Sequence, residues 1–337
     1  MNTLAALYHV VHETSYSYES PVSLSRQHLH LTPRDCPWQS SIAHHIRIDP
    51  EPSFSRLRCD PFGNPVRQFA IEAPHCRLVV HAESTIEVRA HWPIAGQADS
   101  QENSLADSRA NSRANSLADS RANSLVNSPP WEQVRDALDY GATPVLLEVN
   151  CFQFESPYVR VKHEFSSYAR PCFTPSRPLL EAVQGLMNRI YNEFEFDPEA
   201  TTVATPVLKI LEDKRGVCQD FAHLMLSCLR SLGLSARYVS GYLLTKPPPG
   251  QARLVGADAS HAWISVYCPS DVGGVWVDFD PTNNLLPDMQ HITLAWGRDF
   301  GDVSPLRGVI LGGAEHELDV AVTVTPCENN ALTSPGR

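Results

Sequence analysis

The chain has 337 residues, of which 42% are hydrophobic and 19% are charged, and its formal net charge is −11. This composition is that of an ordinary folded protein, long enough for one to three domains. The acidic balance argues against binding to polyanions, so we expect neither nucleic acid nor membrane among its partners. Neither the composition nor the charge indicates an oligomeric state.

The first residues, MNTLAALY, contain no basic segment and no long apolar run. No later segment approaches the ~20 consecutive apolar residues of a membrane-spanning helix. We therefore expect a cytoplasmic protein without a signal peptide. Nine cysteines are scattered along the chain without any CxxC spacing. In a cytoplasmic protein such cysteines are expected to be reduced thiols.

The first ~95 residues have the composition of β-strands bounded by Pro, Asp, Gly and Asn. The predicted strands are residues 8–18, 25–31, 43–48, 66–71 and 76–88. Short punctuated strands favour an antiparallel β-sandwich-like domain over residues 1–95. His28 and His30 would share one strand face, but no cysteine or carboxylate lies beside them at metal-site spacing, so they are interpreted as ordinary strand histidines.

Residues 96–128 differ in kind from the rest of the chain. The nine residues from Ser104 to Ser112 recur without change from Ser116 to Ser124. Ser, Ala, Asn, Asp and Arg dominate this segment, and its few apolar residues cannot offset the entropy of ordering it. The segment is predicted to be a disordered or weakly helical linker.

From residue 129 the sequence predicts helices followed by strands, which is an α+β arrangement. Helices are predicted from Ser176, the expected N-cap, to about Phe194, and over residues 205–213 and 218–232; strands are predicted over residues 236–244, 261–267 and 275–280. Residues 311–324 alternate like one more strand, expected to join the sheet that carries His261. We assign residues 129–326 to this α+β domain, which also holds the candidate catalytic residues described next, and residues 327–337 to a tail.

Cys218 has the local context of a reactive thiol. Gly216 allows a tight turn just before it, and the predicted helix begins at Cys218 itself. The unpaired amides of a first helical turn favour a thiolate and can also stabilise an oxyanion. The alternative is a buried cysteine of the kind expected at Cys228, in the middle of the same helix.

His261 and Asp280 are predicted to be neighbours. His261 begins one strand and Asp280 ends the next, and a turn at residues 270–274 would pair the two strands antiparallel. Asp278 is a rival carboxylate, because it would share a strand face with Asp280. Cysteine, histidine and aspartate in these positions are the parts of a thiol nucleophile, its base and an orienting acid.

A metal site is the less favoured interpretation of the same residues. Cys218, His223, His261 and Asp280 provide zinc-binding side chains, but no two of them are spaced as paired ligands on one element. His223 lies about a turn and a half after Cys218, points away from the thiol, and is predicted to be structural. We therefore expect no metal and no cofactor.

Four motifs resemble those of the bacterial transglutaminase-like proteins, whose core is similar to papain-type cysteine proteases. They are GVCQDFAH (216–223), ARYVSGY (236–242), HAW (261–263) and DPT (280–282), and YSY (16–18) with PV (21–22) resembles the start of the family's N-terminal β domain. The resemblance implies a cysteine-bearing helix packed on an antiparallel sheet, with Cys218 as nucleophile, His261 as base and Asp280, rather than Asp278, as orienting acid. The linker departs from the family pattern.

The expected reaction is thiol acyl transfer on an amide or peptide bond through a thioacyl intermediate. Water as acceptor would make the protein a cysteine peptidase or amidase, and an amine acceptor would make it a transglutaminase. The expected partners are a protein or peptide substrate and an amine acceptor. Two alternatives stay open, a non-catalytic binding module that retains the fold and a metal-dependent hydrolase.

Overall fold

The computed structural model describes residues 5–90, 125–140, 143–244, 260–270 and 274–327. The repeat within the predicted linker and residues 328–337 of the predicted tail lie outside these ranges. Contacts between Cα atoms divide the chain into two compact units. The first comprises residues 1–90, 239–262 and 287–337, and the second comprises residues 91–238 and 263–286.

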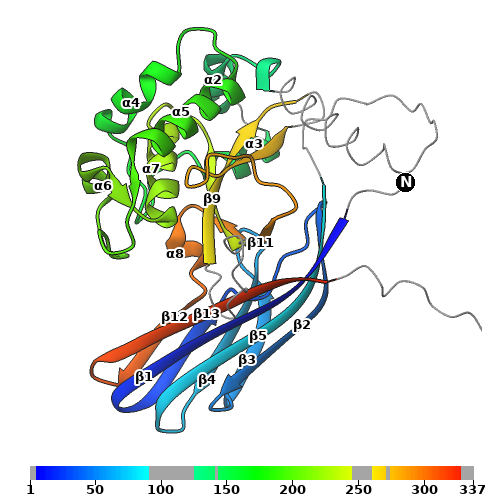
Figure 1. The fold of residues 1–337 in the computed structure, drawn as a ribbon, viewed down its shortest axis with the longest axis vertical. Helices are drawn as coiled ribbons and strands as arrows, with labels where there is room; N and C mark the ends of the chain where they lie inside the picture. Colours follow the sequence, from blue (N-terminus) through cyan, green and yellow to red (C-terminus); the bar gives the residue numbers. More distant parts are fainter. Residues whose placement is uncertain (1–4, 91–124, 141–142, 245–259, 271–273, 328–337) are drawn as a thin grey trace, which may run out of the picture. The chain divides into compact units, whose positions relative to one another are not determined.

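The first unit contains a long antiparallel sheet of seven strands within the described residues (Figure 1). Its strands are β1 (Ala5–Leu29), β2 (Gln39–Asp49), β3 (Phe54–Cys59), β4 (Pro65–Ile71), β5 (His75–Arg89), β12 (Leu306–Gly312) and β13 (His316–Cys327). β1 is the central strand of the sheet. Its first part pairs with β5 and β13, and its last part pairs with β4 and β12. The predicted antiparallel strands of the N-terminal region are confirmed, and residues 306–327, predicted as the end of the following domain and the start of the tail, add β12 and β13 to their sheet.

β1 runs through the point where the sequence predicts a break between two strands. Pro21 lies where the pairing of β1 with β5 shifts register, between Ser17 and Val22. A proline cannot donate a ladder hydrogen bond and is tolerated in a sheet at such irregular positions. The proline therefore interrupts the ladder locally, and the strand continues to Leu29.

One face of this sheet is buried. Val10, His12 and Thr14 alternate with more exposed residues along β1, and Val80 and Ala82 are buried on the paired strand β5. Because side chains alternate across a strand, these buried positions all lie on one side of the sheet. His12 is hydrogen-bonded there, with Nδ1 2.9 Å from the Tyr242 hydroxyl and Nε2 3.0 Å from the Thr14 hydroxyl.

A strand near the C-terminus exists at β13, but the single strand predicted over residues 311–324 is in fact the end of β12 and most of β13, and its predicted partner was wrong. β13 pairs with residues 7–18 of β1, and not with the sheet that carries His261. Alternating hydrophobicity indicates that a segment is a strand, but it does not say which strand edge the segment joins. Here the chain returns to the edge of its own first strand.

The second unit contains most of the helices (Figure 1). They are α2 (Trp131–Tyr140), α3 (Pro144–Asn150), α4 (His163–Ala169), the short 3₁₀ helix η1 (Arg170–Cys172), α5 (Leu179–Glu193), α6 (Val207–Asp213) and α7 (Cys218–Arg230), with the two-residue strands β6 (Glu195–Phe196) and β7 (Arg215–Gly216). α7 contacts α4, α5 and α6 and is almost entirely buried. Among the described helices, none has the length and apolar character needed to cross a membrane.

The predicted N-cap of α5 was wrong. The helix begins at Leu179 with Pro178 at the N-cap, whereas Ser176 lies earlier in a left-handed turn with φ of 61°. The Ser176 amide donates to the Glu132 carboxylate of α2 at 3.0 Å, so this residue connects the segment before α5 to α2 and does not cap α5.

A second antiparallel sheet has the strand order β10-β9-β8-β11. Its strands are β8 (Ala236–Leu243), β9 (Ser260–Cys268), β10 (Val275–Phe279) and β11 (His291–Gly297), and the short helix α8 (Phe300–Val303) follows β11. β9 and β10 pair antiparallel from Cys268 opposite Val275 to Ile264 opposite Phe279, as predicted. Helices followed by antiparallel strands confirm the α+β class.

Candidate active site

Cys218 is the first residue of α7, and a buried carboxylate fixes the turn before it. Asp220 accepts hydrogen bonds from the Val217 amide at 2.9 Å and from the Thr201 hydroxyl at 2.6 Å. A Cβ atom at Gly216 would lie only 2.7 Å from the Asp220 carboxylate and 2.9 Å from its Cβ. Glycine is therefore required at position 216, because the capping carboxylate occupies the space of a side chain.

The chain's buried thiols differ from Cys218 in environment. Cys218 is partly exposed, whereas Cys172, Cys228 and Cys268 are buried. Burial raises the pKa of the Cys172 and Cys228 thiols and raises the pKa of Cys268 to about 12. A thiolate is the reactive form of cysteine, so these three buried thiols are chemically inert at neutral pH.

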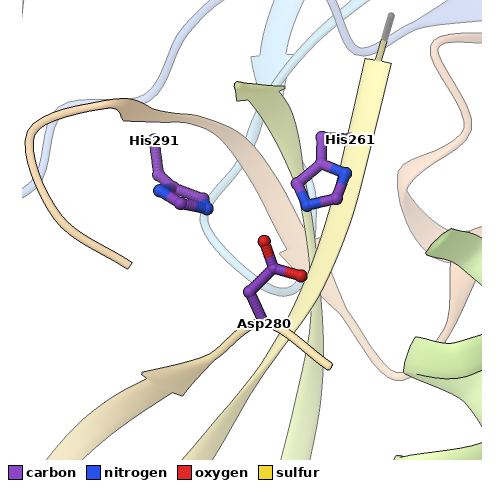
Figure 2. Close-up of side chains that lie close together, drawn as sticks. All are labelled: His261, Asp280 and His291. Atoms are coloured by element: carbon purple, nitrogen blue, oxygen red, sulfur yellow. The ribbon is translucent and has the colours of Figure 1, made fainter. Parts of the chain in front are cut away.

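His261 and Asp280 lie close together at one end of the β8–β11 sheet. His261 is the second residue of β9, and Asp280 directly follows β10. A nitrogen of His261 and a carboxylate oxygen of Asp280 lie within 4.8 Å of each other (Figure 2). The antiparallel β9–β10 pairing accounts for this proximity, since it brings the start of one strand beside the end of the other.

The loop after β10 holds the Asp280 carboxylate in place. One carboxylate oxygen accepts from the backbone amides of Thr282 at 3.0 Å and Asn283 at 3.2 Å. The other accepts from the Asn283 side-chain amide at 2.8 Å. These three donors fix the orientation of the carboxylate. In the sequence, an aspartate followed three residues later by an asparagine could have indicated this loop, but this pattern was not used in the prediction.

Asp278, the rival carboxylate, has a different partner. It accepts a hydrogen bond from the Trp263 indole at 3.1 Å. Trp263 is fully buried, which fits the packing role of a core tryptophan. The structure therefore groups Asp280, and not Asp278, with His261.

His223 is buried between two aromatic rings. Its imidazole stacks on Tyr158 with ring centroids 5.4 Å apart and lies 5.1 Å from the Tyr238 ring. Burial, with a smaller contribution from Arg230, lowers the pKa of His223 to about 3. The imidazole is thus neutral at physiological pH, and its environment is that of a core residue.

The low pKa of His223 predicts a loss of stability in acid. Below pH ~6.5 the unfolded chain protonates this histidine while the folded chain does not, so the free energy of unfolding falls until the pH reaches about 3. Between pH 7 and pH 5, protonation of His223 in the unfolded chain should lower the free energy of unfolding by about 2 kcal/mol. His223→Phe retains an aromatic ring and should reduce the loss between pH 7 and pH 5 by that amount in urea titrations. An equal loss in both proteins would contradict the assignment.

His291, the first residue of β11, completes a group of three donors. Its imidazole, that of His261 and the Asp280 carboxylate each place one donor atom within 4.8 Å of the others, and all three residues are buried. In the described part of the chain, this is the single group of three or more His, Cys, Asp or Glu donors that meets this distance. The group contains neither Cys218 nor His223, so the predicted four-ligand zinc alternative is not assembled.

Two family models match this chain. Residues 8–87 match the bacterial transglutaminase-like N-terminal region, and residues 166–281 match the transglutaminase-like superfamily. An uncharacterized protein of Mycobacterium tuberculosis (strain H37Rv) is 37% identical over 329 residues, covering 96% of this chain and 94% of the relative. The chain belongs to the bacterial transglutaminase-like proteins.

A protein-glutamine gamma-glutamyltransferase of Pseudomonas aeruginosa is also similar to this transglutaminase-like protein, with 28% identity over 113 residues. That match covers 31% of this chain and 16% of the relative. Among solved structures, “The Crystal Structure of a Putative Cysteine Protease from Cytophaga hutchinsonii” has a TM-score of 0.68 and covers 97% of this chain and 93% of its own. At 17% identity, this likeness shows the shared fold.

The N-terminal region of this transglutaminase-like protein holds β11 through two side-chain amides. Gln39 donates to the Thr293 carbonyl at 2.7 Å and accepts from its amide at 2.8 Å. Asn64 makes the same pair of bonds with Trp296, at 2.8 and 3.0 Å. Both amide side chains are fully buried. These contacts lie within the first unit and fix the strand that begins at His291.

Proposed function

We propose that this protein is a thiol acyltransferase in which Cys218 is the nucleophile, His261 the base and Asp280 the orienting acid. The observation that carries the proposal is the His261–Asp280 pair, whose carboxylate is held by three donors from its own loop. The position of Cys218 at the start of a 13-residue helix and the family membership support it.

In the proposed reaction His261 takes the proton of the Cys218 thiol, and the sulfur bonds to the carbonyl carbon of an amide. Amides of the first turn of α7 are the proposed donors to the resulting oxyanion. The tetrahedral intermediate then collapses, the C–N bond breaks, and the leaving amine takes the proton from His261. A thioester remains on Cys218. Asp280 keeps the imidazole oriented and stabilises its protonated form.

The acceptor in the second half-reaction is water or an amine. His261 removes a proton from the acceptor, the acceptor bonds to the carbonyl carbon, and the C–S bond breaks to restore the thiol. The printed name of the Pseudomonas relative favours the side-chain amide of a protein glutamine as the first donor to test. Water would then release a glutamate side chain, and a primary amine would be joined to the protein.

Alkylation by iodoacetamide at pH 6 tests this proposal without a known substrate. Mass spectrometry would follow Cys218 and the exposed thiols of Cys59 and Cys76 in one sample. A thiolate–imidazolium pair should make Cys218 react at least about tenfold faster than the exposed thiols, since the thiolate is the reactive form. His261→Ala should abolish the difference, while His45→Ala, which removes an exposed histidine of β2, should not.

Slow alkylation of Cys218 in the wild type, at the rate of the exposed thiols, would contradict the proposal. The non-catalytic binding module would then be the better interpretation of the same fold. Circular dichroism of each variant separates a lost ion pair from a lost fold.

A further inference from the structure

His261, Asp280 and His291 form a group of three buried metal-binding side chains, and the proposed thiol chemistry uses only two of them. Acyl transfer as proposed uses His261 and Asp280, and it gives no role to His291. Figure 2 shows the Asp280 carboxylate directed toward the space between the two imidazole rings, whose centroids lie 6.0 Å apart. We propose that these three side chains form a binding site for a divalent transition-metal ion, with Zn²⁺ as its preferred occupant.

The donor types fit this ion. Two imidazoles and one carboxylate are a common protein ligand set for Zn²⁺, and they leave a fourth position for water. Ligands at ~2.0–2.1 Å from a tetrahedral Zn²⁺ lie about 3.3 Å from one another. The donor atoms here lie within 4.8 Å of one another, so small side-chain rotations would bring them to the metal.

The surroundings restrict how far the donors can move. Asp280 is held by Thr282 and Asn283, and such outer hydrogen bonds orient a metal-binding carboxylate. The strand that begins at His291 is held by the Gln39 and Asn64 amides. All three donors are buried, whereas the adventitious metal sites of a protein surface are made of exposed histidines. Hydrogen bonds therefore anchor the proposed site at Asp280 and along the strand that begins at His291.

A metal at this site would be an inhibitor, and this consequence rests on the proposed function. Coordination through the ring nitrogen of His261 on the Asp280 side would place the imidazole proton on the other nitrogen, whose lone pair would otherwise accept the Cys218 proton. Removal of the metal by a chelator would return that lone pair. The structure thus points to reversible control of acyl transfer by zinc.

Binding of Zn²⁺ to the full chain tests the site directly. Isothermal titration with zinc chloride should give one tight site in the wild type and in Cys218→Ser. His291→Asn and Asp280→Asn should each weaken it by at least about 10–100-fold, the range seen when metal-ligand networks are disrupted. His45→Ala serves as the control and should bind like the wild type. Where His291→Asn does not fold, His291→Phe keeps the ring volume and replaces it.

The outcomes separate the metal site from the proposed function. Equal affinity in wild type and in both His291 variants, or affinity lost in Cys218→Ser, would overturn the proposed site. Zinc should also lower the rate of Cys218 alkylation at pH 6 in proportion to the fraction of protein that has zinc bound. A chelator should restore the original rate. If zinc binds with the expected dependence on His291 while alkylation never depends on His261, the metal site stands and the proposed function fails. If alkylation depends on His261 but zinc does not bind, the proposed function stands and the proposed metal site fails.

Discussion

Replacing Cys218 by alanine is expected to abolish amide turnover, with a loss of roughly 10⁴-fold or more. The sulfur is the atom that would form the thioester, so no other side chain of the proposed triad can substitute for it. The measurement is ammonia release from a glutaminyl peptide, followed in parallel with hydroxamate formation when hydroxylamine is the acceptor. The ratio of the two products also decides between water and amines as acceptor.

Asp280→Asn should reduce turnover by roughly 10²–10⁴-fold while leaving Cys218 in place. An amide at this position can still accept bonds from the loop, but it no longer stabilises a protonated His261. Cys59→Ala, which removes an exposed thiol, is the matched control and should keep full activity. Activity in Cys218→Ala equal to that of the wild type would refute thiol chemistry altogether.

The sequence was sufficient to predict the elements that carry the proposed triad. The turn between β9 and β10 was readable from its Pro, Ser and Gly residues, and antiparallel pairing then required the start of one strand to meet the end of the other. The start of α7 was readable for a similar reason. Gly216 precedes an apolar stripe, and the close approach of Asp220 shows why a glycine stands there.

His291 could not be predicted as a neighbour of Asp280. It follows Asp280 by a loop and begins β11, which joins the far side of the sheet from β10. No local pattern specifies that placement, because the partner of a strand depends on contacts with distant parts of the chain. The same limit explains the wrong partner predicted for β13, and it explains why Gln39 and Asn64 were overlooked.

Those two amides give the N-terminal region a defined structural role. Each presents a donor and an acceptor to one residue of β11, as a neighbouring strand would. A side-chain amide in that position satisfies backbone groups that would be costly to bury unpaired. The N-terminal region therefore serves as a support for β11, and through it for the strand end where His291 lies.

Gln39→Ala is accordingly expected to destabilise the protein by about 3–5 kcal/mol. The substitution removes the bonds to the Thr293 amide and carbonyl and a further bond from the Gln39 amide to the Arg34 carbonyl at 2.8 Å. Three buried backbone groups would lose a partner, and each unsatisfied group costs about 1–3 kcal/mol, with partial relief from relaxation or water entry. Urea denaturation measures the change in the free energy of unfolding.

Gln133→Ala is the matched control, because Gln133 is an exposed residue of α2 and its loss should change stability by less than about 0.5 kcal/mol. Gln39→Met separates the hydrogen bonds from packing, since it preserves the length of the side chain but offers no amide; it should be nearly as destabilising as alanine. A loss below about 1 kcal/mol in both Gln39 variants would mean that β11 is held by apolar packing alone. A large loss in both would tie the stability of the strand beginning at His291 to a polar residue of the N-terminal region.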